Sequence, residues 1–258
     1  MLVAENISYK IGDKTLLENV SLSFEPGKLN LIIGPNGAGK STLIKTLCNQ
    51  IRPDTGHIFY ANRDINKISI TELARIRSVL SQNIELAFPL RVNEVVMMGR
   101  YPHFVNDPTE QDELACMESM QFFDVDYLSD RNYMTLSGGE KQRVHFARVI
   151  SQIWYPITGN YRYLFLDEPL TFLDVRYQFN FMRKIVELLK NTDIVVVGVV
   201  HDLNLAAKFS DKIILLNDGK VIASGNKYEV LTKENVKTTY QLEPVIVEGK
   251  ESLYLFFD

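Results

Sequence analysis

The sequence predicts an α/β protein in which a mixed-sheet core carries a small N-terminal antiparallel sheet and an inserted helical segment. Three observations support this fold class. The apolar run 29–33 ends in a glycine-rich loop, and helix-forming residues follow from Lys40, which is the strand–loop–helix unit of a parallel sheet. Residues 2–9 and 16–24 alternate in part between apolar and polar, as strands do. Residues 92–153 instead favour helices.

These elements divide a single domain into a core, an insertion and a tail. The expected parts are a core with its β subdomain at 1–91 and 155–225, a helical subdomain at 92–154 and a C-terminal tail at 226–258. Within the insertion, Asn93 is predicted to cap one helix, and Thr109 with Asp112 to cap another. In the tail we expect short helices within 229–240 and strands within 244–257.

Composition and charge exclude several classes of protein. The chain has 258 residues, of which 46% are apolar and 23% charged, and its net charge is −4. These values are typical of globular proteins and differ from those of disordered chains or basic nucleic-acid binders. The apolar run 194–200 is far shorter than the roughly 20 residues of a membrane span, and we expect no signal peptide. Cys48 and Cys116 are too few for a disulfide framework, so we expect a reducing compartment.

Residues 34–41, Gly-Pro-Asn-Gly-Ala-Gly-Lys-Ser, match the phosphate-loop pattern G-x-x-x-x-G-K-[ST] in full. Glycines let the backbone curl so that its N–H groups point at a phosphate, and the following helix adds the positive end of its dipole. Lys40 would supply a cation to the β- and γ-phosphates, and the Ser41 hydroxyl can bind Mg²⁺. The predicted nucleotide contacts are Gly34, Pro35, Asn36, Gly37, Ala38, Gly39, Lys40, Ser41 and Thr42.

A pair of acidic residues follows the apolar strand 163–166. Asp167 and Glu168 come directly after this strand, whose carboxyl end should face the crevice where α/β proteins bind ligands. Asp167 is predicted to orient the Mg²⁺ shell, and Glu168 to polarise the attacking water as a general base. Taken alone, two acids at a strand end are more typical of a solvated loop.

Residues 136–144, Leu-Ser-Gly-Gly-Glu-Lys-Gln-Arg-Val, lie between these two motifs and resemble the signature of ATP-binding cassette (ABC) ATPases. Gln82 stands where that family has its Q-loop, Asp174 where it has the D-loop, and His201 where it has the switch histidine. The resemblance runs from about residue 2 to 225 and implies the P-loop NTPase fold of that family. By itself, the signature segment could be an ordinary helix N-cap, and His201 a core histidine.

The resemblance implies a mechanism that needs two copies of the chain. In the family, two subunits stack head to tail and enclose two ATP molecules, each between one chain's phosphate loop and the other chain's signature. Gln82 would then sense the γ-phosphate and join Ser41 and Asp167 as a metal ligand, while His201 would hold the γ-phosphate and water. The partner's nucleotide would be contacted by Ser137, Gly138, Gly139, Glu140 and Asp174. The implied catalytic residues are Lys40, Gln82, Asp167, Glu168 and His201.

Two positions depart from the family pattern. Many members stack an aromatic residue on adenine where this chain has Ile11. Tyr9 faces the same side of the predicted strand, so it either contacts the base or packs against the core. Residues 170–172 replace the commoner threonine–serine–alanine run before the D-loop aspartate, which would alter packing between two copies and leave Asp174 in place.

Two segments indicate which ABC ATPases the chain resembles. Residues 92–103 are similar to the segment that meets the permease in importers of iron–siderophores, heme and cobalamin, so Arg100 and Tyr101 are predicted partner contacts. The alternative is an ordinary amphipathic helix. The link 151–160 looks like that of heme-import (hemin) ATPases, although its Trp154 could simply anchor the loop. We therefore favour heme over siderophore or cobalamin as the cargo.

The leading hypothesis is a Mg-ATP hydrolase that drives a membrane importer. It would lie peripherally on the cytoplasmic face of the inner membrane, contact permease subunits directly and a substrate-binding protein indirectly, and bind no nucleic acid. A soluble ABC ATPase of DNA repair or translation is disfavoured, because we find neither a long coiled-coil insertion nor a second cassette. A regulatory module without turnover is disfavoured by the full set of catalytic residues.

Overall fold

The centre of the protein is a six-stranded sheet in the order β10-β9-β3-β8-β7-β6. The computed structural model describes residues 1–81, 89–171, 173–190, 192–249 and 252–257. The strands are β3 (Lys28–Ile33), β6 (Arg77–Leu80), β7 (Arg162–Leu166), β8 (Ile194–Val199), β9 (Lys212–Asn217) and β10 (Lys220–Gly225). All neighbours pair in parallel except β10, which runs antiparallel to β9. The predicted mixed sheet is confirmed.

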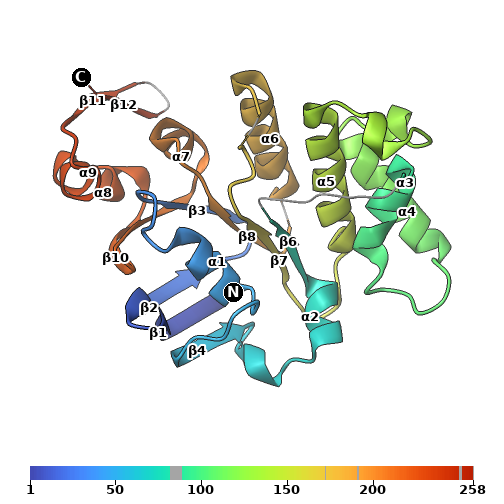
Figure 1. Cartoon of the computed structure of the whole chain (residues 1–258), viewed down its shortest axis with the longest axis horizontal. Helices are drawn as coiled ribbons and strands as arrows, with labels where there is room; N and C mark the ends of the chain where they lie inside the picture. The colour runs from blue at the N-terminus through green and yellow to red at the C-terminus, as the bar shows by residue number, and fades with distance from the viewer. Residues whose placement is uncertain (82–88, 172, 191, 250–251, 258) are drawn as a thin grey trace.

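A second, antiparallel sheet has the order β2-β1-β4-β5 and lies at the lower left of Figure 1. Its strands are β1 (Leu2–Ile11), β2 (Lys14–Phe24), β4 (Thr55–Tyr60) and β5 (Arg63–Asp64). The residues of β1 and β2 that face inward, such as Leu2, Leu17 and Phe24, are fully buried. The antiparallel N-terminal sheet predicted from the partial alternation is therefore present.

The middle of the chain is helical. Its helices are α2 (Ile70–Ile76), α3 (Val92–Met97), α4 (Glu110–Phe122) and α5 (Gly138–Gln152). Figure 1 shows α3, α4 and α5 beside one another at the right of the molecule, away from the antiparallel sheet. The division of the chain at 92 and 154 stays a prediction.

The predicted start of α4 is confirmed, and that of α3 is wrong by two residues. The Asp112 carboxylate accepts a hydrogen bond from the Thr109 N–H at 3.0 Å, which completes the capping box. Helix α3 begins after Arg91 instead of at Asn93. The Asn93 N–H donates to the Ser129 carbonyl at 3.0 Å, and the Glu94 carboxylate accepts from the Arg91 N–H at 2.6 Å. Asn93 therefore lies inside the helix, and its N–H, which is one of the first helix donors without a partner in the helix, is satisfied by a distant segment.

The last third of the chain alternates helices and strands and then forms a separate hairpin. The remaining helices are α6 (Val175–Leu188), α7 (Leu203–Phe209), α8 (Lys227–Val230) and α9 (Lys233–Tyr240). Strands β11 (Pro244–Glu248) and β12 (Leu253–Phe257) pair antiparallel at the upper left of Figure 1, near α7. The short helices and strands predicted for the tail are confirmed.

Two apolar clusters lie on opposite faces of the central sheet. In β3, Leu29, Leu31 and Ile33 belong to one cluster and Ile32 to the other, as expected from the alternation of side chains along a strand. The helix α1 (Lys40–Leu47) packs into the second cluster through Leu43 and Leu47. Burial on both faces fixes the end of β3, from which the glycine-rich loop leaves. Among the described residues, no helix combines the length and apolar character that crossing a membrane requires.

Candidate functional site

The glycine-rich loop between β3 and α1 needs glycine for close approach and for backbone conformation. Gly34 has φ of 151°, and a Cβ there would lie 2.1 Å from the Leu216 carbonyl oxygen. Gly39 has φ of 99°, and a Cβ there would lie 2.5 Å from the Leu16 carbonyl oxygen. Any larger residue at either position would have to push backbone atoms apart. The loop is therefore held between β2 and β9, with Gly39 at the N-cap of α1.

Lys40 lies inside this loop. Its side chain is buried, and its ammonium donates to the carbonyl oxygens of Gly34 and Pro35, each at 2.9 Å. Burial lowers the pKa of Lys40, while the nearby Glu168 and Asp167 carboxylates raise it. The loop thus brings a cation to the place where the sequence predicts the phosphates. The other predicted contacts lie along the same loop and the start of α1, namely Asn36, Gly37, Ala38, Ser41 and Thr42.

The two predicted metal-binding residues that the structure describes lie next to each other. The Ser41 hydroxyl, at the start of α1, donates to Asp167 Oδ1 at 3.0 Å, although 126 residues separate them. Asp167 follows β7 and is 8% exposed. Burial raises the pKa of Asp167 because it disfavours the charged carboxylate, and the Ser41 hydrogen bond partly offsets this effect. Gln82, the third predicted metal ligand, lies outside the described residues.

The Glu168 and His201 side chains are in contact at the carboxyl ends of β7 and β8. Glu168 Oε1 lies 2.9 Å from His201 Nε2, and both residues line a cavity of about 220 Å³. Glu168 has a left-handed backbone with φ of 52°, which is strained for a residue other than glycine. The Thr171 N–H and hydroxyl both donate to the Glu168 carbonyl, at 3.3 and 3.1 Å, and so help to hold this turn. The structure thus joins two residues that the sequence placed in separate motifs.

The signature segment begins helix α5. Ser137 is the N-cap, and Glu140 closes a capping box by accepting from the Ser137 N–H at 2.8 Å. A Cβ added to Gly138 or Gly139 would meet no atom within 4 Å, and neither residue has a positive φ. The fold of this chain therefore does not require glycine at either position. Asp174 likewise caps a helix, accepting from the Tyr177 N–H at 3.0 Å at the start of α6.

Sequence reasoning missed the residue that joins the signature helix to the loop that carries Glu168. Gln142, one turn into α5, donates from its side-chain amide to the Pro169 carbonyl at 3.1 Å. Pro169 directly follows Glu168. The only signal in the sequence was that Gln142 lies within the signature segment itself.

The structure favours one of the two alternatives for Tyr9. Its ring packs against the buried cluster beneath the antiparallel sheet, whereas Ile11 is 61% exposed at the end of β1. Ile11 therefore presents an open apolar surface, and Tyr9 has a packing role.

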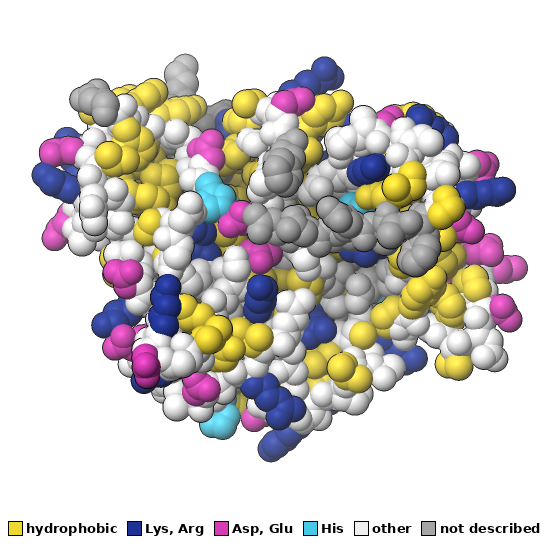
Figure 2. Space-filling view, viewed as in Figure 1, with side chains coloured by type: hydrophobic (Ala, Val, Ile, Leu, Met, Phe, Trp, Pro, Cys, Tyr) yellow, Lys and Arg dark blue, Asp and Glu magenta, His cyan; other side chains and the backbone are white. Residues whose placement is uncertain are grey.

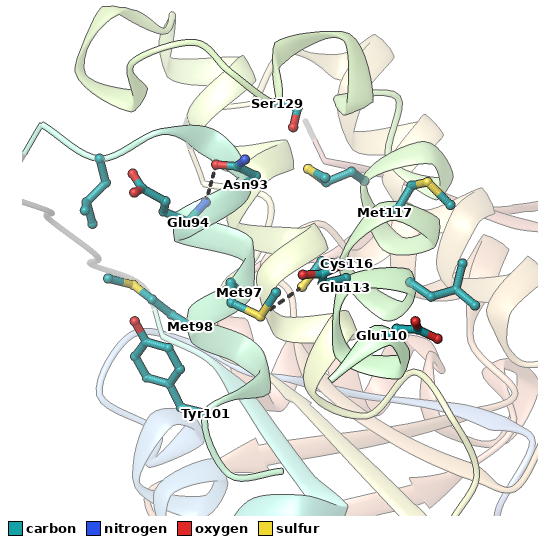
Figure 3. Close-up of a pocket in the computed structure, with 13 residues that line it drawn as sticks. Asn93, Glu94, Met97, Met98, Tyr101, Glu110, Glu113, Cys116, Met117 and Ser129 are labelled. Atoms are coloured by element: carbon teal, nitrogen blue, oxygen red, sulfur yellow. Dashed lines mark hydrogen bonds between the residues drawn. The ribbon is translucent and has the colours of Figure 1, made fainter. Parts of the chain in front are cut away.

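A groove of about 770 Å³ lies between α3 and α4 (Figure 3). Figure 3 shows methionines from both helices around it, and the two helices are joined there by Cys116 Sγ at 3.9 Å from Met97 Sδ. Tyr101 lines the groove and is 58% exposed. The further lining residues include the apolar Leu90, Met98, Leu114, Met117 and Met120 and the acidic Glu94, Glu110 and Glu113.

The prediction that Arg100 contacts a partner is wrong, and Tyr101 alone keeps that prediction. Arg100 is 4% exposed, and its guanidinium pairs with Asp112 at 2.9 Å and donates to the Ser151 carbonyl at 2.8 Å. The side chain therefore joins the end of α3 to α4 and α5. The pairing of Asp112 with this charge could not be predicted, because the sequence pattern shows Asp112 only as part of the cap of α4.

Trp154 anchors its loop to the helical insertion. Its indole N–H donates to Glu118 Oε2 at 2.6 Å, and the Tyr155 hydroxyl donates to the same oxygen at 2.7 Å. The indole also contacts Phe122 in α4 at 5.8 Å between ring centroids. The anchoring alternative for Trp154 is confirmed, with α4 as the anchor.

Comparison with known proteins now adds to this geometry. The family described as ABC transporter matches residues 17–171, which include the glycine-rich loop, the signature and the acidic pair. The chain belongs to the ABC transporter family. The hemin import ATP-binding protein HmuV of Escherichia coli O157:H7 is 41% identical over 248 residues, covering 96% of this chain and 95% of that protein. The HmuV protein of Gloeobacter violaceus is 43% identical over 247 residues, with 96% and 90% covered.

Solved structures agree with this membership. An ABC transporter in an inward-facing conformation has a TM-score of 0.81 at 24% identity, covering all of this chain and 96% of that chain, and shows the fold. A bacterial ABC transporter cassette solved as a dimer has a TM-score of 0.73 at 25% identity, with 88% and 99% covered. This ABC ATPase thus has relatives that assemble as dimers.

Proposed function

We propose that this ABC ATPase binds and hydrolyses Mg-ATP and that a dimer of the chain powers import of hemin through a membrane permease. The observation that carries the hydrolytic part is that three motifs meet at the carboxyl ends of β3, β7 and β8. The Ser41–Asp167 hydrogen bond joins the glycine-rich loop to the end of β7, and Glu168 beside it contacts His201 at the end of β8. The relatives named as hemin import proteins support the cargo.

The residues at the crevice fit a magnesium ion. Ser41 and Asp167 offer a hydroxyl and a carboxylate oxygen, which are the ligands that Mg²⁺ prefers, and the burial of Asp167 leaves its charge poorly solvated. When bound, Mg²⁺ would neutralise charge on the phosphate oxygens. Lys40 would bind the β- and γ-phosphates by exchanging its two carbonyl contacts for phosphate oxygens.

Glu168 is proposed as the residue that orients and polarises the attacking water, and His201 as its positioning partner near the γ-phosphate. The 2.9 Å contact between them would hold the carboxylate in the lining of the small cavity. A general base of this kind contributes about 10²–10⁴-fold to a rate. Ile11 is the apolar surface proposed to lie against adenine, because it is exposed at the end of β1.

The signature is proposed to bind the nucleotide held by a second copy. Gly138 and Gly139 have no steric reason for glycine within this chain, which is expected if a ligand from outside approaches their backbone. The start of the 15-residue helix α5 adds the positive end of its dipole to the Ser137 hydroxyl. Asp174 is proposed to lie at the same interface between copies.

The groove between α3 and α4 is proposed as the permease contact. Methionines and an exposed tyrosine around one hollow suit an apolar partner segment, because flexible thioethers adapt to the surface they meet. Docking there would hold the protein at the cytoplasmic face of the membrane.

Reconstituted transport tests the proposal. The protein is co-purified with its permease, placed in vesicles and supplied with ATP, and the uptake of hemin, cobalamin and a ferric siderophore is compared. We expect ATP-dependent uptake of hemin. Uptake of cobalamin or the siderophore instead would correct the cargo, and ATP hydrolysis without any uptake would favour a soluble, non-transport ABC ATPase.

A further inference from the structure

One side chain joins the C-terminal hairpin to helix α7. Asn204, the second residue of α7, accepts a hydrogen bond from the Leu255 N–H at 2.8 Å through Oδ1 and donates from Nδ2 to the Leu255 carbonyl at 3.1 Å. The amide satisfies both backbone groups of one β12 residue, as a neighbouring strand would. Because β12 pairs only with β11 in the described part of the chain, this contact covers its other edge.

Packing brings the same two elements together. Leu253 and Leu255, on the inner face of the hairpin, are 6% and 3% exposed and belong to the same apolar cluster as Leu203 and Leu205 of α7. The outer face instead carries exposed apolar residues, which Figure 2 shows as a yellow area at the upper left. The hairpin is thus fixed to α7 on one face only.

The end of α7 that Asn204 bonds to the hairpin is its N-terminal end, which lies next to His201. The Asp202 carboxylate accepts from the N–H groups of Asn204 and Leu205 at 2.7 and 3.1 Å. Asn204 is therefore held at its backbone by the cap residue and at its side chain by the hairpin. His201 directly precedes that cap and reaches Glu168 at 2.9 Å.

We propose that Asn204 is a positioning residue that uses the hairpin to fix the first turn of α7, and thereby holds His201 against Glu168. This inference rests on the proposed function of the Glu168–His201 pair. It gives the C-terminal hairpin a role in hydrolysis although none of the hairpin residues that the structure describes lines the cavity beside Glu168.

The first test compares two asparagines in the full-length chain. Asn204→Ala should lower kcat for ATP about tenfold, because a small misplacement of a reacting group is costly, and leave the dissociation constant for ADP, which has no γ-phosphate, unchanged. Asn235→Ala is the matched control. Asn235 Nδ2 donates to the Val230 and Glu229 carbonyls at 3.0 and 3.4 Å, so it fixes α9 to α8 in the same tail without a bond to α7. Its kcat should equal that of the unaltered chain.

A second measurement separates positioning from general damage. In a Glu168→Gln background, the ratio of ATP to ADP affinity is measured for Asn204→Ala, His201→Ala and both together. We expect Asn204→Ala to lower the ratio and to have no further effect once His201 is absent. If Asn204→Ala does not fold, Asn204→Asp, which keeps the acceptor for the Leu255 N–H and loses the donor, should give an intermediate loss.

Three results would overturn the inference. They are an unaltered kcat for Asn204→Ala, an equal loss of kcat for Asn235→Ala, and additive effects of Asn204→Ala and His201→Ala on the ratio of ATP to ADP affinity. Normal ATP hydrolysis by Glu168→Gln would be a different failure, since it would remove the proposed function and leave the Asn204 contact as architecture only.

Discussion

The nucleotide crevice and the groove between α3 and α4 are built in opposite ways. In the crevice, individual polar and charged side chains are held by specific contacts, as in the Ser41–Asp167 hydrogen bond and the Glu168–His201 contact. In the groove, several methionines surround a hollow together with Glu94, Glu110 and Glu113. The crevice therefore depends on chemical identity at each position, whereas the groove depends on apolar area and shape.

This contrast predicts different responses to substitution. A near-isosteric change in the crevice should abolish the reaction and leave the fold intact. In the groove, only a change that adds charge should matter, because methionine and leucine substitute for one another at little cost. Substitutions in the crevice, in the groove and at the buried Arg100–Asp112 ion pair test that difference.

Glu168→Gln should reduce kcat for ATP about 10³-fold, because the amide cannot act as a general base. The dissociation constant for ATP should stay close to that of the unaltered chain, since the phosphate loop is untouched. Steady-state phosphate release and equilibrium binding measure the two quantities. Thr171→Ser, which keeps the hydroxyl that donates to the Glu168 carbonyl, is the control and should retain activity.

Arg100→Ala should lower the free energy of unfolding by about 3–5 kcal/mol, because it leaves the Asp112 carboxylate buried without its cation. Urea denaturation measures this change. Arg91→Ala breaks an exposed pair with Asp130 instead and should cost less than about 1 kcal/mol. Equal losses for the two variants would mean that Arg100 is not the structural residue described above.

Met117→Glu should weaken binding of the permease about tenfold or more, because it removes apolar area and adds a carboxylate to a groove that Glu94, Glu110 and Glu113 already line. Its ATP hydrolysis without permease should be unaltered. Val105→Glu adds the same charge at a residue that is 93% exposed and outside the groove, so its binding should not change. Equal binding by all three proteins would place the permease contact elsewhere.

Asp167→Asn should raise the melting temperature of the nucleotide-free protein while abolishing hydrolysis. Burial raises the pKa of Asp167, so the folded state binds a proton more tightly than the unfolded state, and the charged carboxylate costs stability at neutral pH. The gain from Asn should be full above the raised pKa and shrink as pH falls through it. Thermal unfolding of both proteins is measured from about pH 4 to about pH 8, which covers the range in which a carboxyl group with a raised pKa titrates. A melting temperature lower than that of the unaltered chain at pH 7 would contradict it.

The sequence predicted the crevice well because its motifs are local. Residues 34–41 carry both the glycines that form the loop and the lysine that the loop holds, so one short segment contains the whole predicted phosphate loop. Asp167 and Glu168 could be added because strand ends in a parallel sheet share one edge. Neither argument required knowing how distant segments pack.

The parts that could not be predicted depend on distant contacts. Arg100 was predicted as a partner contact because residues 92–103 resemble a segment that meets the permease, whereas its burial is decided by Asp112 and Ser151. The bond between Asn204 and Leu255 spans 51 residues and involves backbone groups, which leave no trace in the sequence. Residue identity alone does not reveal such pairs.

Hydrolysis is proposed to take place between two copies of this chain, each of which contributes its signature segment to the nucleotide bound by the other. Light scattering on Glu168→Gln tests it most directly. Without nucleotide the mass should be that of one chain, 29.6 kDa, and with Mg-ATP it should double. Adding Ser137→Arg to the same chain should prevent the doubling, since a bulky cation would replace the cap of α5 at the shared site. A mass that stays at one chain with Mg-ATP, or that doubles despite Ser137→Arg, would contradict the account.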